Sequence, residues 1–251
     1  MDACKIERLL RQSSPIRCYN DIDSTNVSAK AWALEGAPHG ATVLADHQLA
    51  GHGRMGRSYY SPPGGLYMSI ILDADDLPPG MVTTLAAVSV LKSVQALSGQ
   101  ALKIKWVNDL LLDGRKVCGI LAESLSMQRQ LSRVVLGIGI NTVSVAFPPE
   151  IVDTAGSLAR DGENLDREWL AAAILNDLIA GLTLCPRHLA DYRAHCVTLG
   201  RQIQFIHDGQ LRTGIARDVD MKGALLVDTA QGSLRLEAGE VSVRGVDGTY
   251  F

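Results

Sequence analysis

The chain has 251 residues, of which 47% are hydrophobic and 20% charged, and its formal net charge is −3. This composition is typical of a globular protein with one large domain, or one domain and a small addition. The near-neutral charge and the lack of a basic run argue against binding to nucleic acid or to an anionic membrane. The first residues lack the apolar core of a signal peptide, and no uninterrupted apolar run reaches about 18–20 residues. We therefore expect a cytoplasmic protein.

Helices and strands alternate along the first 200 residues. Apolar residues at helical spacing predict helices, and short apolar runs bounded by turn residues predict strands. Their order favours an α+β chain with a mixed, largely antiparallel central sheet and flanking helices, rather than strict βαβ repetition. The expected helices are Ile6–Gln12, Val27–Glu35, Met81–Leu97, Glu168–Leu184 and His188–Cys196, and the expected strands are Ile16–Ile22, Ala41–Ala45, Leu66–Leu72, Leu102–Trp106, Leu110–Asp113, Lys116–Glu123 and Arg133–Ile140.

The pattern changes after about Gly200, where short strands alternate with glycine-containing turns. Five such strands predict a small β-barrel. We place the boundary at Val197–Gly200, which gives a main domain at residues 1–197 and a barrel at residues 198–251. The expected barrel strands are Ile203–His207, Leu211–Arg217, Ala224–Asp228, Ser233–Leu236 and Glu240–Val243.

A glycine-rich loop between two apolar strands is the most informative segment. In Gly51–Arg57, glycines alternate with His52, Arg54 and Arg57, and Gln48 lies just upstream. Glycine lets a ligand approach the backbone closely, and guanidinium groups match phosphate oxygens. The loop therefore indicates a site for a phosphate or an acyl phosphate. The alternative is a solvated turn.

A second group of polar residues lies where a strand ends and a hairpin begins. Asn108 and Asp109 carry oxygens suited to Mg²⁺ or to a ribose, and Lys116 can neutralise an oxyanion. Lys105 lies in the same stretch. The alternative is a turn pair beside a solvated lysine, because Asn and Asp are common turn residues.

Two glycines, Gly137 and Gly139, stand inside an apolar strand. Interior glycines weaken a strand unless something approaches the backbone closely. Asn141, at the end of this strand, could reach the same ligand.

The cysteines are odd in number and scattered, at positions 4, 18, 118, 185 and 196. This distribution argues against a disulfide framework. Cys185 and His188, with His195–Cys196, could bind a metal, but their spacing matches no common zinc pattern. Packing residues of a helical segment are the favoured interpretation.

In order and spacing, these motifs resemble those of biotin protein ligases. The resemblance implies a class II synthetase-like ligase domain at residues 1–197, followed by an SH3-like barrel. It also implies a two-step reaction, in which biotin and ATP form biotinyl-5′-AMP and a carrier lysine then takes the biotinyl group. The resemblance extends from Asp21 to Gly245 and rests on Asp23–Asn26, Gln48–Tyr67, Lys105–Asp109, Lys116–Leu121, Gly137–Asn141, Gly223–Leu226 and Gly239–Arg244.

The resemblance also implies roles for individual residues. Asp109 would accept a proton from the incoming lysine, and Arg54 and Lys116 would complete the catalytic group. Asn108 would contact Mg²⁺, and Tyr59 would lie against adenine, where tryptophan is usual. Biotin would be bound by Ser24, Thr25, Asn26, Gln48, Gly51, His52, Gly53, Arg54, Lys116, Gly119, Gly137 and Gly139, and ATP by Arg54, Arg57, Tyr59, Lys105, Asn108, Lys116 and Asn141.

Three positions depart from the family pattern. His52 stands where arginine is usual, Met55 where a second arginine often occurs, and Val107 where proline is common. We expect activity to survive the His52 change with weaker biotin affinity, because backbone N–H groups make many contacts in such loops.

By the same resemblance, the partner is the biotin carrier domain of a carboxylase such as acetyl-CoA carboxylase. ATP, Mg²⁺ and biotin are the expected small molecules, with no tightly bound prosthetic group. Some family members carry an N-terminal DNA-binding domain. The roughly twenty residues before Asp21 are too few for one, so we expect no DNA binding. Exposed strands of the central sheet could pair two subunits in a homodimer.

Two alternatives differ in chemistry. A lipoate protein ligase shares the fold and the adenylation step, but the loop and Lys105–Asp109 favour biotin. A biotin-binding module without turnover would not need Arg54, Arg57, Asp109 and Lys116 together. Pyrophosphate release separates an enzyme from such a module.

Overall fold

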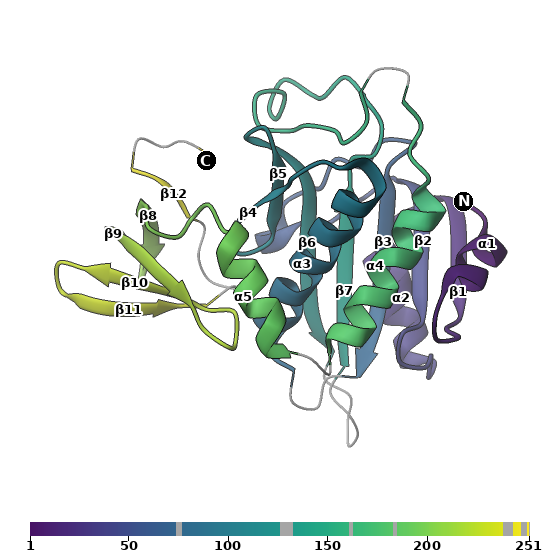
Figure 1. Cartoon of the computed structure of the whole chain (residues 1–251), viewed down its shortest axis with the longest axis horizontal. Helices are drawn as coiled ribbons and strands as arrows, with labels where there is room; N and C mark the ends of the chain where they lie inside the picture. The colour runs from purple at the N-terminus through teal and green to yellow at the C-terminus, as the bar shows by residue number, and fades with distance from the viewer. Residues whose placement is uncertain are drawn as a thin grey trace.

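The computed structural model describes residues 1–73, 77–125, 133–160, 163–182, 185–237, 243–246 and 250, without the side chains of residues 185–187. Two sheets lie side by side in Figure 1. The larger has seven strands in the order β1-β2-β3-β7-β6-β5-β4. Its strands are β1 (Ile16–Ile22), β2 (Thr42–Gln48), β3 (Leu66–Asp73), β4 (Lys103–Lys105), β5 (Asp109–Leu112), β6 (Arg115–Leu125) and β7 (Arg133–Ile140).

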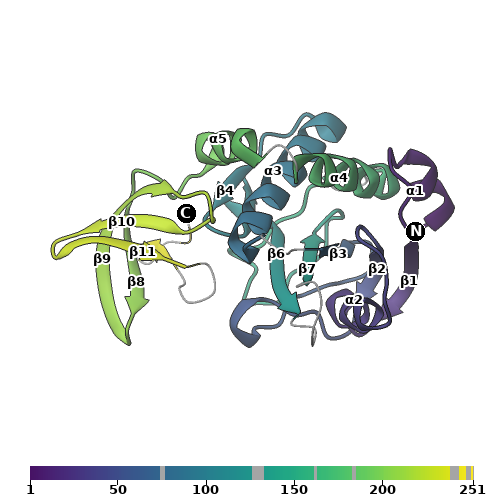
Figure 2. The same cartoon turned by 90° about the horizontal axis from the view of Figure 1, so that it is seen from below.

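Helices cover both faces of this sheet. Figure 2 shows α3, α4 and α5 on one side and α2 on the other. The main core lies between the sheet and α3 and α4, whereas a smaller cluster that includes Ala29, Ala33 and Val135 lies under α2. The helices are α1 (Ala3–Leu9), α2 (Thr25–Leu34), α3 (Pro79–Ser98), α4 (Arg167–Gly181) and α5 (Cys185–His195).

The second sheet has five antiparallel strands in the order β11-β10-β9-β8-β12. It contacts the larger sheet through Trp106, whose Nε1 donates to the carbonyl of Gly223 at 3.0 Å. Gly80 has no room for a side chain at this contact, because a Cβ there would lie 2.5 Å from the carbonyl oxygen of Lys222. The strands are β8 (Gln202–His207), β9 (Gln210–Val219), β10 (Leu225–Thr229), β11 (Gly232–Leu236) and β12 (Arg244–Gly245).

The predicted fold class is confirmed: the structure is α+β, with a mixed central sheet and a separate C-terminal antiparallel sheet. The β1–β2 pair is parallel, and the other neighbouring strands of the larger sheet are antiparallel. Asp113 and Gly114 form the turn between β5 and β6, with φ of 50° and 78° at the two residues. Of the predicted last strand, residues 240–242 lie outside the described part of the chain.

Helix α3 is long and apolar enough to cross a membrane by length and composition alone. In the structure 72% of its most apolar stretch is buried inside the protein. The search for an uninterrupted apolar run did not detect this helix, because Thr, Ser and Lys residues interrupt its apolar sequence. Its position matches that of a core helix, packed on β6, β7, α4 and α5.

Candidate functional site

Side chains of three adjacent strands alternate between the main core and a shallow floor under α2. On β7, Ile138 and Ile140 enter the core, whereas Gly137 and Gly139 lie on the other face, against Asn26 of α2 and against Tyr59. Successive residues of a strand point to opposite faces, so the i, i+2 glycines leave a gap in the floor. Gly139 is paired with Gly119 of β6, which widens this gap.

The N-terminus of α2 forms one end of the gap. Gln48, the last residue of β2, caps the helix, because its Oε1 accepts from the backbone N–H of Thr25 at 2.9 Å and from the Thr25 hydroxyl at 3.0 Å. Its Nε2 donates to Ser61 Oγ at 2.9 Å. Ser24 and Asn26 are buried beside Thr25. The sequence motif from Asp23 to Asn26 therefore becomes a polar wall at a helix N-terminus.

The glycine-rich loop lies across the gap. Gly53 N–H donates to the carbonyl of Arg57 at 2.7 Å, and His52 and Ser58 form an antiparallel bridge. Residues Arg54–Gly56 form a short 3₁₀ turn, and Arg57 is its C-cap residue. Within it, Met55 takes a φ of 57°, a conformation that few side chains adopt readily. The loop is thus a closed hairpin that holds Arg54 over the floor.

The phenol ring of Tyr59 fills the space that two glycines leave. Its hydroxyl donates to the carbonyl of Gly139 at 2.8 Å. A Cβ at Gly139 would lie 2.6 Å from Tyr59 Cε1, and one at Gly119 would lie 2.8 Å from Cε2. Burial raises the pKa of Tyr59 well above its ordinary value, so the hydroxyl stays protonated and donates.

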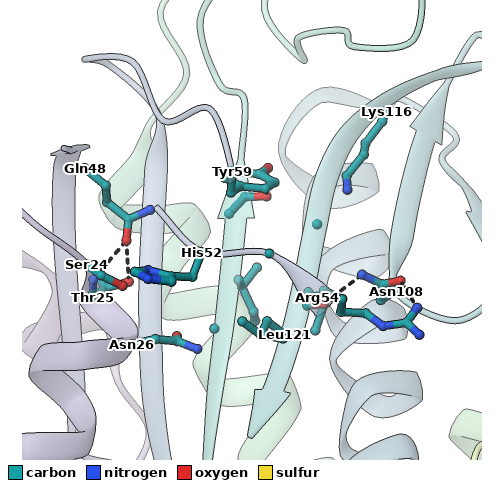
Figure 3. A pocket seen from close by; sticks show the side chains of 16 residues that line it. Ser24, Thr25, Asn26, Gln48, His52, Arg54, Tyr59, Asn108, Lys116 and Leu121 are labelled. Carbon is teal, nitrogen blue, oxygen red and sulfur yellow. Dashed lines mark hydrogen bonds between the residues drawn. The ribbon is translucent and has the colours of Figure 1, made fainter. Parts of the chain in front are cut away.

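A first hollow lies between these elements, with about 470 Å³ of empty space when the part open to solvent is included. Figure 3 shows Gln48 and Thr25 at one end and Arg54 and Lys116 at the other, with Tyr59 between them. Its lining residues are Ser24, Thr25, Asn26, Gln48, His52, Gly53, Arg54, Tyr59, Asn108, Lys116, Gly119, Ile120, Leu121, Gly137, Ile138 and Gly139.

A second hollow of about 690 Å³ adjoins the first. The two share Arg54 and Lys116, and the second receives residues from both sheets. It is lined by Gly53, Arg54, Met55, Arg57, Ser58, Tyr59, Lys105, Trp106, Asn108, Asp109, Lys116, Val243, Arg244 and Tyr250.

The carboxylate of Asp109 lies in the second hollow, with its side chain only 13% exposed. Lys116 Nζ lies 2.6 Å from Asp109 Oδ1, and the hydroxyl of Tyr250 donates to Oδ2. Burial by itself would raise the pKa of Asp109. The charge and hydrogen bond of Lys116, the Tyr250 hydroxyl and the charge of Lys105 outweigh it and hold this pKa below its ordinary value.

Lys105 lies buried beside this carboxylate, and its Nζ sits 3.5 Å from the centre of the Tyr250 ring. Burial lowers the pKa of Lys105 to about 8. Asp109 opposes this change, whereas Arg244 adds to it. The amine therefore gains or loses its charge within the range in which enzymes are assayed.

The structure gathers most of the predicted site residues, with two exceptions. Asn141 lines neither hollow; its Nδ2 instead donates to the carbonyl of Gly156 at 2.8 Å. Gly51 also lies outside both linings, and its role is steric, because a Cβ there would lie 2.5 Å from Ser61 Oγ. Sequence reasoning missed Tyr250, since no local pattern brings a residue so far along the chain to Asp109.

The predicted Mg²⁺ contact through Asn108 does not fit a dedicated metal site. Its Oδ1 accepts a hydrogen bond from Arg54 Nη1 at 3.0 Å, so the oxygen that would contact the metal already has a cationic partner. Among the described residues, no three His, Cys, Asp or Glu side chains are grouped to hold a metal. The described cysteines, Cys4, Cys18, Cys118 and Cys196, are unpaired.

Comparison with protein families gives two adjacent matches. Residues 18–141 match the biotin/lipoate A/B protein ligase family, and residues 198–244 match the biotin protein ligase C-terminal domain.

Individual relatives agree. The chain is 34% identical over 246 residues to a "Bifunctional ligase/repressor BirA" of Bacillus spizizenii, covering 90% of this chain and 73% of the relative. It is 34% identical over 232 residues to a "Biotin--[acetyl-CoA-carboxylase] ligase" of Mycobacterium tuberculosis, covering 87% and 85%. The structure resembles the biotin protein ligase from Aquifex aeolicus in complex with biotin and ATP, with a TM-score of 0.81, 26% identity and coverage of 92% and 99%.

Proposed function

The chain belongs to the biotin protein ligase family, and from this premise we propose that it attaches biotin to a carrier lysine in two ATP-dependent steps. The protein is an enzyme, a biotin ligase. In the first proposed step, a carboxylate oxygen of biotin attacks the α-phosphorus of ATP, and the bond to pyrophosphate breaks. In the second, a lysine amine attacks the acyl carbon of biotinyl-5′-AMP, and AMP leaves.

One arrangement above all supports this proposal. Two hollows meet, and their shared lining contains the cations of Arg54 and Lys116. An adenylation site needs a carboxylate to meet an α-phosphate at such a boundary, because the reaction depends mainly on positioning and charge stabilisation. The two cations lie where both negative groups would meet.

The lining of the first hollow supports the assignment of biotin to it. Polar groups of Thr25 and Gln48 lie at one end, where a ureido ring needs both donors and acceptors. Leu121 and the ring of Tyr59 line the middle, which suits an aliphatic chain. We assign the head of biotin to the first end and its carboxylate to Arg54 and Lys116.

The second hollow then takes ATP. Arg57 and Lys105 supply positive charge for the phosphates, and the ring of Tyr59 forms part of the wall. Because Asn108 does not fit a metal site of its own, we propose that Mg²⁺ enters as part of the magnesium–ATP substrate. This agrees with the preference of Mg²⁺ for substrate phosphates.

Asp109 is the proposed proton acceptor of the second step. A lysine ammonium has no free electron pair, so it must lose a proton before it attacks. Asp109 is ionised at neutral pH, because Lys116 and its other partners hold its pKa low. The lysine would approach the second hollow from the side of Arg244, in the C-terminal sheet, and of Tyr250.

We propose the carrier domain of acetyl-CoA carboxylase as the protein substrate, since relatives are named for it. We also propose that residues 1–197 form the ligase domain and residues 198–251 a barrel that completes the second hollow. To test the transfer, the enzyme is incubated with biotin, magnesium–ATP and the purified carrier domain. The carrier should gain one biotinyl group by mass, and a carrier whose acceptor lysine is replaced by arginine should gain none. If the enzyme exchanges pyrophosphate with biotin but the carrier gains no mass, the assignment of the carrier is contradicted.

A further inference from the structure

The ring of Tyr250 covers Lys105 at the edge of the seven-stranded sheet. Lys105 is the last residue of β4, the outermost strand of that sheet, yet the residue is only 5% exposed. Its Nζ lies 3.5 Å from the centre of the Tyr250 ring, and both residues line the second hollow. Lysine is rarely buried to this extent, so the cover provided by a distant part of the chain points to a role for it.

Three contacts hold the ring in this position. The first is the ring face against Lys105, and the second is the hydroxyl, which donates to Asp109 Oδ2. Burial and the charge of Asp109 raise the pKa of Tyr250, so the hydroxyl keeps its proton. The third is Arg244, whose guanidinium carbon lies 5.8 Å from the ring centre. Because Lys105 and Asp109 are directly opposite each other in the β4–β5 pair, one ring contacts two neighbouring strands.

The ring has two opposite effects on the charge of the Lys105 amine. Its aromatic face attracts an ammonium group, which favours the charged amine, whereas its exclusion of water disfavours the charged amine. Among the surrounding charges, Asp109 raises the pKa of Lys105, and Arg57, Lys116 and Arg244 lower it. Burial is the largest of these effects, and it lowers this pKa to about 8. Water exclusion therefore outweighs the attraction of the ring.

We propose that Tyr250 is a positioning residue for the nucleotide step: its ring keeps water from Lys105 and holds the amine toward the phosphates of ATP in the second hollow. This inference rests on the proposed function, because ATP is the ligand. Charges interact more strongly where water is excluded, so a covered ammonium attracts a phosphate more strongly than a hydrated one. The ring also restricts a flexible side chain before the nucleotide arrives, which reduces the loss of entropy on binding.

Three substitutions of Tyr250 separate the ring from its hydroxyl and from its bulk. The measurement is the titration of Lys105 by NMR, from its Cε resonance in isotopically labelled full-length protein, assigned by its loss in Lys105→Arg. Tyr250→Phe keeps the ring and should leave the pKa of Lys105 unchanged. Tyr250→Ala admits water and should raise it by about half a pH unit or more. Tyr250→Leu excludes water without an aromatic face and should lower it by about half a pH unit.

The pH dependence of pyrophosphate exchange should follow this titration. Tyr250→Ala should lower kcat/KM for ATP about threefold at pH 7 and move its alkaline limit to higher pH. Tyr250→Leu should move the limit to lower pH, and Tyr250→Phe should behave like the wild type. A merely structural role of Tyr250 predicts instead a loss of kcat/KM at every pH, with the limit in place.

Tyr60→Ala is the matched control, since Tyr60 is a partly exposed tyrosine that packs on the ring of Phe147 and lines neither hollow. It should change neither the titration of Lys105 nor kcat/KM for ATP, and changes equal to those of Tyr250→Ala would contradict the inference.

The inference is overturned if Tyr250→Ala and Tyr250→Leu move the pKa of Lys105 in the same direction or leave it unchanged. It is also overturned if Tyr250→Phe acts like Tyr250→Ala, or if the alkaline limit of an active enzyme does not follow the titration. Failure of the proposed function is seen separately, as folded wild-type protein that exchanges no pyrophosphate with biotin. The NMR titration needs no activity and tests the effect of the ring on Lys105 in that case too.

Discussion

Lys116 Nζ and Asp109 Oδ1 lie 2.6 Å apart at the edge of the two hollows, so one ion pair joins the residue assigned to the anionic substrates with the residue assigned to the incoming lysine. The register that brings them together is a short hairpin, in which β5 begins at Asp109 and β6 contains Lys116. These assignments separate the two half-reactions, because Lys116 serves adenylation and Asp109 serves the transfer to the carrier. The first prediction follows from that separation.

Asp109→Asn should affect transfer far more than adenylation. Asparagine cannot take a proton from the lysine ammonium, so we expect the rate of transfer to the carrier to fall by about 100-fold or more. Pyrophosphate exchange should fall by less than tenfold, since Lys116 keeps its charge. Asp113→Asn is the control, because Asp113 is exposed in the next turn and should affect neither rate. Equal losses in both half-reactions would contradict the role of Asp109.

Lys105 should give the nucleotide step an alkaline limit. Burial lowers its pKa to about 8, so the free enzyme loses this positive charge as the pH rises through 8. We expect kcat/KM for ATP to fall above pH 8, since this parameter reports groups of the free enzyme. Lys105→Arg should move the limit to higher pH, and Lys103→Met, at an exposed lysine of the same strand, should leave it in place. An unchanged alkaline limit in Lys105→Arg would disprove the assignment.

Gly139→Ala tests whether the position of the Tyr59 ring matters for biotin binding. The new methyl group would lie 2.6 Å from Tyr59 Cε1, so the ring must move and its hydrogen bond to the residue 139 carbonyl is weakened. The ring then enters the first hollow. We expect the KM for biotin to rise at least tenfold, with a smaller change in the KM for ATP. A KM for biotin equal to that of the wild type would show that the ring has no such role.

Tyr250 should compete with the carrier lysine for Asp109. Its hydroxyl occupies Asp109 Oδ2, and an incoming ammonium has to displace it. Tyr250→Phe keeps the ring but removes this bond, so we expect the KM for the carrier to fall at least threefold. Pyrophosphate exchange without carrier should be unchanged. A higher KM for the carrier would mean that the hydroxyl assists binding.

Local patterns predicted the elements well where local forces decide them. The strands Ile16–Ile22 and Arg133–Ile140 have the predicted bounds. The first helix starts at Ala3 rather than at Ile6, because the Asp2 side chain caps it by accepting from the N–H of Lys5. The parallel pairing of β1 with β2 depends on the path of α2 between them and could not be read from either strand alone.

The same contrast between local patterns and long-range contacts holds for the site. Motifs that are continuous in the sequence predicted the loop, the hairpin and the glycine pair. The contacts of Asn26 with Ser69 and Glu123 could not be predicted locally, because they join a helix to two separate strands. The contact predicted between Asn141 and ATP stays a prediction; in the structure the Asn141 Nδ2 donates to the carbonyl of Gly156, a bond that joins two separate segments.

The central claim is that two adjoining hollows join biotin to the α-phosphate of ATP. The most direct measurement is ATP–pyrophosphate exchange by the purified protein, with biotin or lipoate as the acid and no carrier present. The account predicts Mg²⁺-dependent exchange with biotin and none with lipoate. Exchange with lipoate alone, or no exchange by folded protein that binds biotin, would contradict it.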